Sequence, residues 1–352
     1  MGAEHLRRAA TNGEYTGVAH HALQRPSARI AGGAEYLQCI IGDFHGHFRG
    51  KYFGWRRFEH VGKASRGANC GAVDERARAV DADPGDIWAV HAVAHVHEMT
   101  DRSAEGIAWL AQTEDGWRDC NNFTTHVWWH RALYHFESEE YDGVLKLYDD
   151  EFRAEASEDY LDISNAVAML WRLERCGVAI GGRWQELAEK AKKRTDEYLL
   201  VFADMHFALA LAAAGKGQAL DGMIESMRAA IASRLTTQEK VLARVGAILT
   251  QAIRADFQGD FDLALRLMLP LRYHVRAIGG SHAQRDIFTQ LPIDLVLKCK
   301  KFALARALLH ERTAAKPNSP RAWKLLAEAL AGEGRAKDAA AAHQRAEKLL
   351  SA

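Results

Sequence analysis

The chain has 352 residues, and its 46 basic and 46 acidic side chains give a formal net charge of zero, with 17 histidines in addition. A balanced charge excludes the basic surface that nucleic acid or an anionic membrane requires of a binding partner. Hydrophobic residues at 48% and charged residues at 26% are ordinary for a globular chain and exclude disorder throughout.

The beginning of the sequence and its cysteines both favour a cytoplasmic protein. Met1 is followed by no apolar segment of the kind found in signal peptides. The most apolar stretch, 199–214, contains Asp204 and His206 and is too short to span a bilayer. Five cysteines, odd in number and far apart, indicate reduced thiols and neither a disulfide framework nor a thiolate zinc site. We therefore expect no membrane partner.

Residues 1–72 form an atypical N-terminal segment. Gly- and Arg-rich strings such as 45–50 and 55–58 interrupt it, and no apolar stripe of helical period persists. The segment is typical of a poorly ordered region. Helical spacing begins at residue 73, so we predict a second region, 73–352, that is all-α.

Helical spacing in residues 73–352 recurs in units that predict a tetratricopeptide-like array. Such a repeat has about 34 residues and consists of two helices that cross where only small side chains fit. Ala94 and Gly106 occupy those places in the first unit, and Val90 and Val93 are its predicted core residues. The following units are marked, in chain order, by Trp128 and Ala132 before a turn at 140–144; 161–195; 198–233; Ala252 before a turn at 259–265; 286–317; and Trp323, Ala327, Gly334 and Ala339.

Stacked repeats of this kind form an α-solenoid with a concave face lined by the first helix of each unit. His91 and His95 lie one turn apart on one predicted helix, and His126 and His130 lie one turn apart on the next. In this phase all four face the concave side together with Glu98. Neutral imidazole is a common ligand of transition metals, so these four histidines are candidate ligands of a divalent transition-metal ion.

The alternative is that these histidines are ordinary surface or inter-helix residues, since no complete zinc-protease pattern surrounds them. Trp129, Glu98 and Arg285 are candidate ligand-binding residues on the same face. Asp204 and His206 interrupt an apolar helix, where an unpaired polar group is costly. His282 and Asp286 follow a Gly-Gly-Ser turn in which Ser281 is predicted to cap a helix. A buried structural network is the alternative for this second group.

Five segments together resemble bacterial-type members of the tetratricopeptide repeat protein 38 family. They are Trp88-Ala-Val-His-Ala-Val-Ala-His, Cys120-Asn-Asn-Phe, His126-Val-Trp-Trp-His, Phe202-Ala-Asp-Met-His and Ser281-His-Ala-Gln-Arg-Asp. The resemblance covers about residues 79–352. It implies a cytoplasmic helical-repeat protein and supplies no established catalytic residues. Residues 1–72 depart from the family pattern.

Three functions fit these observations, because a fold does not by itself define a function. The first is a scaffold that binds a small polar ligand or a peptide in a histidine-rich concave pocket. The second is a metal-assisted or His/carboxylate-dependent hydrolase, in which His206, His282, Asp204 and Asp286 are the candidate catalytic residues. The third is an assembly protein with incidental histidines. Whether the protein is an enzyme, which ligand it binds and whether it forms a homo-oligomer are left open by the sequence.

Overall fold

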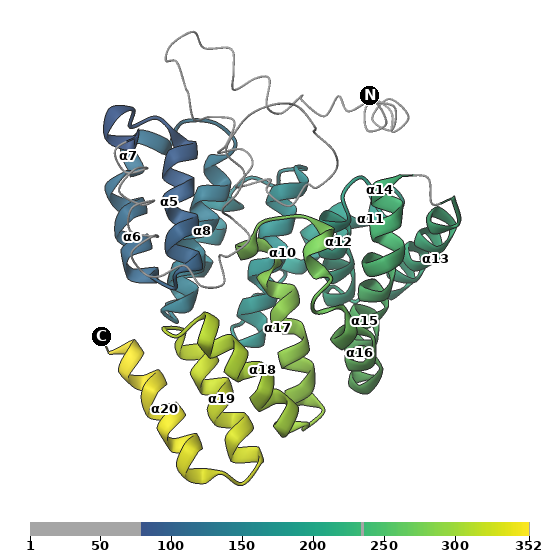
Figure 1. The fold of residues 1–352 in the computed structure, drawn as a ribbon. Helices are drawn as coiled ribbons and strands as arrows, with labels where there is room; N and C mark the ends of the chain where they lie inside the picture. Colours follow the sequence, from purple (N-terminus) through teal and green to yellow (C-terminus); the bar gives the residue numbers. More distant parts are fainter. Residues whose placement is uncertain (1–78, 234–235, 352) are drawn as a thin grey trace, which may run out of the picture. The chain divides into compact units, whose positions relative to one another are not determined.

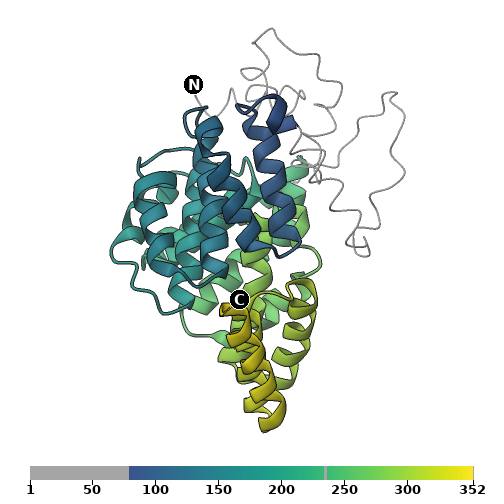
Figure 2. The ribbon, with the colours of Figure 1, turned by 90° about the vertical axis from the view of Figure 1, so that its left-hand side faces the viewer.

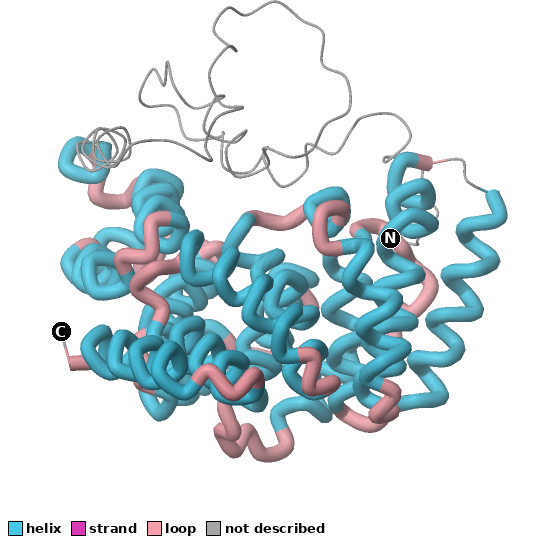
Figure 3. The backbone as a smooth tube through the Cα atoms, turned by 60° about the horizontal axis from the view of Figure 1, so that its bottom comes forward, coloured by secondary structure: helices cyan, strands magenta, loops and turns pink. Residues whose placement is uncertain are grey.

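A computed structural model describes residues 79–233 and 236–351, which contain sixteen α-helices and no β-strand (Figure 1, Figure 3). The predicted all-α class is therefore confirmed for the described part of the chain. Residues 1–72, which we predicted to be atypical, lie outside it. Among the described helices, none has the length and apolar character needed to cross a membrane.

The described residues divide into two compact units. The first unit comprises 188–281 and the second comprises 79–187 together with 282–351, while α11 (Arg183–Lys192) spans the boundary. The first unit contains α12 (Val201–Ala213), α13 (Gly217–Ser233), α14 (Thr237–Val241), α15 (Ala247–Phe257) and α16 (Phe261–Met268). The second contains α5 (Ile87–Met99), α6 (Ser103–Gln112), α7 (Glu114–Trp117), α8 (Thr124–Glu137), α9 (Tyr141–Leu147), α10 (Tyr160–Arg175), α17 (His282–Lys298), α18 (Phe302–Ala315), α19 (Pro320–Gly332) and α20 (Ala336–Leu350).

Helices form pairs at the places where the sequence predicts them. α5 packs on α6, α8 on α9, α15 on α16 and α19 on α20, and this last pair is clear in Figure 1 and Figure 2. Helix starts follow from capping residues, because a side-chain oxygen satisfies backbone N–H groups that the first turn leaves open. Asp86 accepts two such N–H groups at α5, and Ser319 caps α19 directly before Pro320. Gly259 has φ of +83°, which ends α15 in a left-handed conformation that suits glycine.

Small residues allow α6 to approach α8 closely. A Cβ atom placed on Gly106 would lie 2.6 Å from the ring of Tyr134 on α8, closer than any real carbon contact. Tyr134 is fully buried, and its hydroxyl donates a hydrogen bond to the carbonyl of Ala94 on α5. The ring therefore lies between the two small residues that the sequence places at the helix crossing. The predicted core residues Val90, Val93, Ala94, Trp128 and Ala132 are all buried.

α17 joins two parts of the second unit that are far apart in the sequence. It packs on α5 and α10, which precede it by more than a hundred residues, and on α18, which follows it. In an open repeat array each repeat contacts only its neighbours. The contacts of α17 with α5 and with α10 are thus additional to those of a simple array, and they bring the polar residues at the start of α17 into the core.

We expect Gly106→Ala to destabilise the protein by about 1–3 kcal/mol, because the added methyl group overpacks the fixed ring of Tyr134. Gly143→Ala is the matched control, since nothing lies within 4 Å of a Cβ at this helical position. Replacing an exposed helical glycine by alanine should be neutral or stabilise by about 0.5–1 kcal/mol. Urea unfolding of both variants measures the difference, and equal stabilities would contradict the crossing at Gly106.

Candidate metal centre

Four histidines from two neighbouring helices meet in the second unit. His91 and His95 lie one turn apart on α5, and His126 and His130 lie one turn apart on α8. One ring nitrogen from each lies within 4.8 Å of the others. The convergence that the sequence suggested for these four residues is therefore present, and we call them the histidine cluster.

The spacing of the nitrogens suits a small ion. His91 Nε2 and His130 Nε2 are 3.1 Å apart, which is a hydrogen-bond distance if one of them carries a proton. It is also close to the separation of about 3.3–3.4 Å between two nitrogens that bind one tetrahedral zinc ion, given Zn–N bonds of about 2.0–2.1 Å. The Nδ1 atoms of His91 and His130 are buried and have no hydrogen-bond partner among the described residues.

Burial keeps the cluster neutral. His91, His126 and His130 are at most 3% exposed, whereas His95 is half-buried. Desolvation, and then the neighbouring imidazoles, hold the pKa of His91 and of His130 well below the usual value for histidine. Desolvation and His95 lower the pKa of His126 to about 3. Each of these three rings is thus in the deprotonated state that a metal ligand requires.

Aromatic side chains surround the imidazoles. Trp129 is fully buried and stacks on His126 with ring centroids 5.3 Å apart. Phe123 meets the ring of His91 edge-on at 4.8 Å and stacks on Trp88. Trp129, a predicted ligand-binding residue, is therefore part of the wall of the cluster. We predicted that the histidines line a concave face, and three of the four are buried between α5 and α8.

A chain of amides connects the cluster to two further helices. The side chain of Asn165 on α10 is 2.9 Å from His126 Nδ1, and Gln284 on α17 donates to Asn165 at 3.3 Å. As placed, Asn165 Nδ2–H donates to His126 Nδ1; exchanging the O and N atoms of both amides would instead let His126 Nδ1–H donate to Asn165. His126 Nε2 then presents its lone pair to an ion. Such outer hydrogen bonds orient histidine ligands in metal sites.

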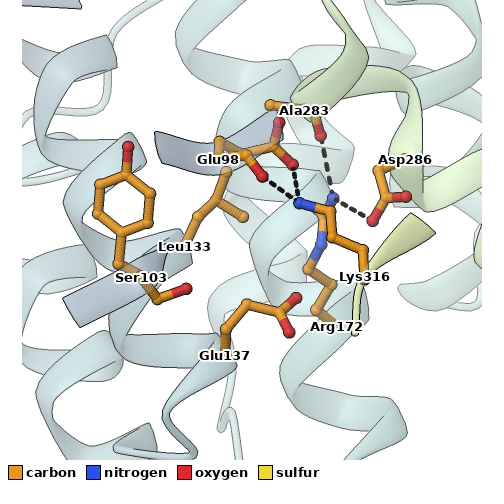
Figure 4. Close-up of a pocket in the computed structure, with 9 residues that line it drawn as sticks. Glu98, Ser103, Leu133, Glu137, Arg172, Ala283, Asp286 and Lys316 are labelled. Carbon is orange, nitrogen blue, oxygen red and sulfur yellow. Dashed lines mark hydrogen bonds and ion pairs between the residues drawn. The ribbon is translucent and has the colours of Figure 1, made fainter. Parts of the chain in front are cut away.

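Glu98 lies in a different place from the cluster. Its carboxylate pairs with Lys316 at 2.7 Å and lines a small cavity with Arg172 and Asp286 (Figure 4). The space open to the centre of a water molecule there is about 10 Å³, which is room for about one water. Glu98, Arg172, Asp286, Arg312 and Lys316 form what we call the ion network. Our grouping of Glu98 with the four histidines is not supported by this arrangement.

Asp286 also belongs to the ion network. Both of its oxygens accept hydrogen bonds from Arg312, and Arg172 lies 4.0 Å away. Although burial opposes ionisation, these cations hold the pKa of Asp286 well below its usual range. This placement favours the structural network over a catalytic role for Asp286. Arg285 is buried beside it, whereas His282 is exposed at the first position of α17.

Asp204 and His206 lie on α12 in the first unit. His206 is fully buried, and its Nδ1 hydrogen-bonds the carbonyl of Phe202 at 2.7 Å. Asp204 is 2% exposed, and one of its oxygens has no hydrogen-bond partner in the described residues. Burial raises the pKa of Asp204 well above its usual value and so disfavours the ionised carboxylate that a general base requires.

The sequence reasoning missed residues that the structure connects to these sites. Asn165 is an amide among the mostly apolar residues 163–171 of α10, and Arg172 is a charge that directly follows them. A polar residue within an apolar stretch indicates a buried group that needs a partner. The sequence therefore contains a signal for both residues. Arg312 and Lys316 gave no such signal, since both lie on a helix end with ordinary amphipathic spacing.

No family model matches this chain. The likeness to the tetratricopeptide repeat protein 38 family therefore stays a resemblance of sequence segments. A function has to be argued from the geometry of the sites.

We expect Asp286→Asn to destabilise the protein by about 3–5 kcal/mol at pH 7, because it leaves buried cations without their carboxylate. The folded pKa of Asp286 lies below its unfolded value of about 3.9, so its contribution is complete above that pH and is lost as the pH falls below it. The gap between wild type and variant should be constant from pH 7 to about pH 4 and narrow in more acid solution.

Asp338→Asn is the matched control, because its ion pair with Arg335 is about half exposed on both sides. Such surface substitutions usually change stability by less than about 0.5 kcal/mol. Urea unfolding across the pH range measures both variants. A loss for Asp286→Asn no greater than that of the control would mean that the ion network does not stabilise the fold.

Proposed function

We propose that the protein binds a transition-metal ion at His91, His95, His126 and His130, and that this ion links α5 to α8. The observation that carries the proposal is the convergence of four ring nitrogens within 4.8 Å, three of them on buried imidazoles whose pKa burial holds below the usual value. Imidazole ligands suit zinc, copper and nickel, whereas magnesium and calcium prefer oxygen. Zinc is the ion we expect first, because it accepts four ligands in tetrahedral geometry.

Burial decides between an ion and a larger ligand. A peptide or a polar molecule in a groove needs side chains that it can touch, and three of the four imidazoles are nearly inaccessible. A metal ion of atomic size can reach them past His95, which is half-buried. We therefore favour metal binding over the peptide scaffold that the sequence alone suggested.

The hydrolase is the second candidate, and the half-buried position of His95 supports it. A catalytic zinc keeps one coordination position for water or substrate, and an exchangeable His95 would provide that position. A general base is also required, but the described carboxylates lie outside the cluster, and Asp286 is held by Arg312. Metal binding without catalysis is accordingly our first proposal.

We also propose that the helix pairs form a tetratricopeptide-like array, and that the protein belongs with the family it resembles. The positions of the pairs and the close crossing at Gly106 support the array. A cytoplasmic location is part of the same proposal. It is supported by Cys120, Cys176 and Cys299, which form no disulfide in the described part of the chain, as expected in a reducing compartment.

Elemental analysis of untagged protein tests the metal site. After equilibration with zinc and removal of excess ion, we expect about one zinc per chain in the wild type and none in His91→Ala/His130→Ala. The matched control is His135→Ala, which removes an imidazole from α8 that pairs with Glu140 outside the cluster. It should bind zinc as the wild type does.

Thermal unfolding of the wild type makes the test independent of whether the double variant folds. Zinc at a hundred times its dissociation constant should stabilise the native state by about 2.7 kcal/mol and raise Tm by several degrees. If neither zinc, copper, nickel nor cobalt is retained in stoichiometric amount or raises Tm, the metal site is wrong. Retention of zinc by a folded double variant would also exclude it.

The amide chain supplies a finer test. We expect Asn165→Leu to weaken zinc binding by about 10–100-fold, because His126 loses the partner that orients its ring. Ser164→Ala is the control on the same buried turn, since that hydroxyl bonds only the carbonyl of Tyr160. Competition with a chromophoric zinc chelator measures both affinities, and an unchanged affinity in Asn165→Leu would exclude Asn165 from the site.

A further inference from the structure

A second cavity, separate from the histidine cluster, lies in the second unit between α10, α17, α18 and α19. Its volume is about 280 Å³, close to the lower limit of about 300 Å³ that is typical of small-molecule pockets. One wall is apolar and consists of Ile293, Leu297, Leu309 and Leu325, while the ring of Trp171 contributes from α10. We call this cavity the cleft.

Charged side chains form the remaining wall of the cleft, and all of them except Arg321 and the exposed Glu328 have partners among the described residues. Asp294 pairs with Lys298 at 2.9 Å and with Arg175 at 3.4 Å. Arg312 is held by Asp286, as described above. Glu137 accepts a hydrogen bond from Ser319 at 2.7 Å, and its charge acts favourably on Arg312 and Lys316. These groups therefore do not require a ligand for their charge to be balanced.

Arg321 is the exception among the cations of the cleft. No carboxylate of the described chain lies within ion-pair distance of it, and its Nη1 donates a hydrogen bond to the sulfur of Cys176 at 2.9 Å. Burial raises the pKa of the Cys176 thiol, so this sulfur is a neutral and weak acceptor. The Nε–H of Arg321 is buried and has no acceptor in the described residues. A buried donor without a partner is costly.

The position of Arg321 on its helix is a second unfavourable feature of this unpaired cation. It is the second residue of α19, a helix of 13 residues, and a cation there opposes the positive end of the helix dipole. An anion in the cleft would pair with the guanidinium and would also be favoured by the helix N-terminus. A guanidinium binds a carboxylate through two parallel hydrogen bonds, which is its strongest and most specific mode.

We infer that the cleft binds a small organic carboxylate with an apolar body, held by Arg321 at its acid end and by the leucine and isoleucine wall at its other end. The apolar wall and the size of the cavity select such a molecule over a simple inorganic anion. None of the four histidines lines the cleft, so binding there does not depend on the metal site.

The probe for the test is 4-methylpentanoate, and the neutral 4-methylpentanamide is its matched control. The indole N–H signal of Trp171 reports occupancy of the cleft in a nitrogen–proton correlation spectrum, and Trp171→Phe assigns that signal. We expect the carboxylate to shift it in a saturable way in the wild type. The amide should bind at least tenfold more weakly.

Arg321→Gln should also weaken binding of 4-methylpentanoate at least tenfold, because the substitution removes the one cation of the cleft that has no carboxylate partner among the described residues. Arg335→Gln is the control variant, since that arginine pairs with Asp338 on the exposed surface outside the cleft. No saturable shift in the wild type would overturn the proposal. So would equal binding of acid and amide, or an unchanged affinity in Arg321→Gln.

Discussion

Charged side chains buried between helices have to find partners, and this constraint organises the second unit. The ion network joins residues that are far apart in the sequence, since Lys316 pairs with Glu98 and Asn318 bonds Asp101. Removing one partner of a buried pair costs far more than a surface pair contributes. These buried ion pairs and hydrogen bonds therefore hold the C-terminal helices against α5 and α8.

The histidine cluster meets the same constraint in another way. An imidazole can lose its proton, so His91, His126 and His130 can be buried together where three lysines cannot. The neutral rings still have lone pairs and N–H groups. Aromatic neighbours such as Phe123 and Trp129 are not strong hydrogen-bond partners for them. The buried Nδ1 atoms of His91 and His130 are an example. A metal ion bound at the Nε2 atoms of these two rings would use their lone pairs and leave Nδ1 as the N–H group, so the close approach of the Nε2 atoms and the neutrality of the rings together point to binding.

Much of the fold follows from the sequence, and much less of the sites does. Helix pairs are local, and spacing, capping residues and turns such as 140–144 and 259–265 locate them. The meeting of His91 with His130 also follows, because each pair occupies one face of a neighbouring helix. Burial of the cluster does not follow, since it depends on how closely α5 and α8 pack. Lys316 and Glu98 are 218 residues apart in the sequence, so no local pattern predicts that they pair.

α10 and α17 connect the two proposed sites through rigid geometry. Asn165 bonds Gln284 near the histidine cluster, and Arg175 pairs with Asp294 beside the cleft. Each partner is ten residues further along its own helix, so the two helices run in the same direction and are joined at points about 15 Å apart. The amide that orients His126 thus also sets the spacing of the helices that bound the cleft. Asn165 and Arg175 on α10 thus hold α17 in place beside both proposed sites.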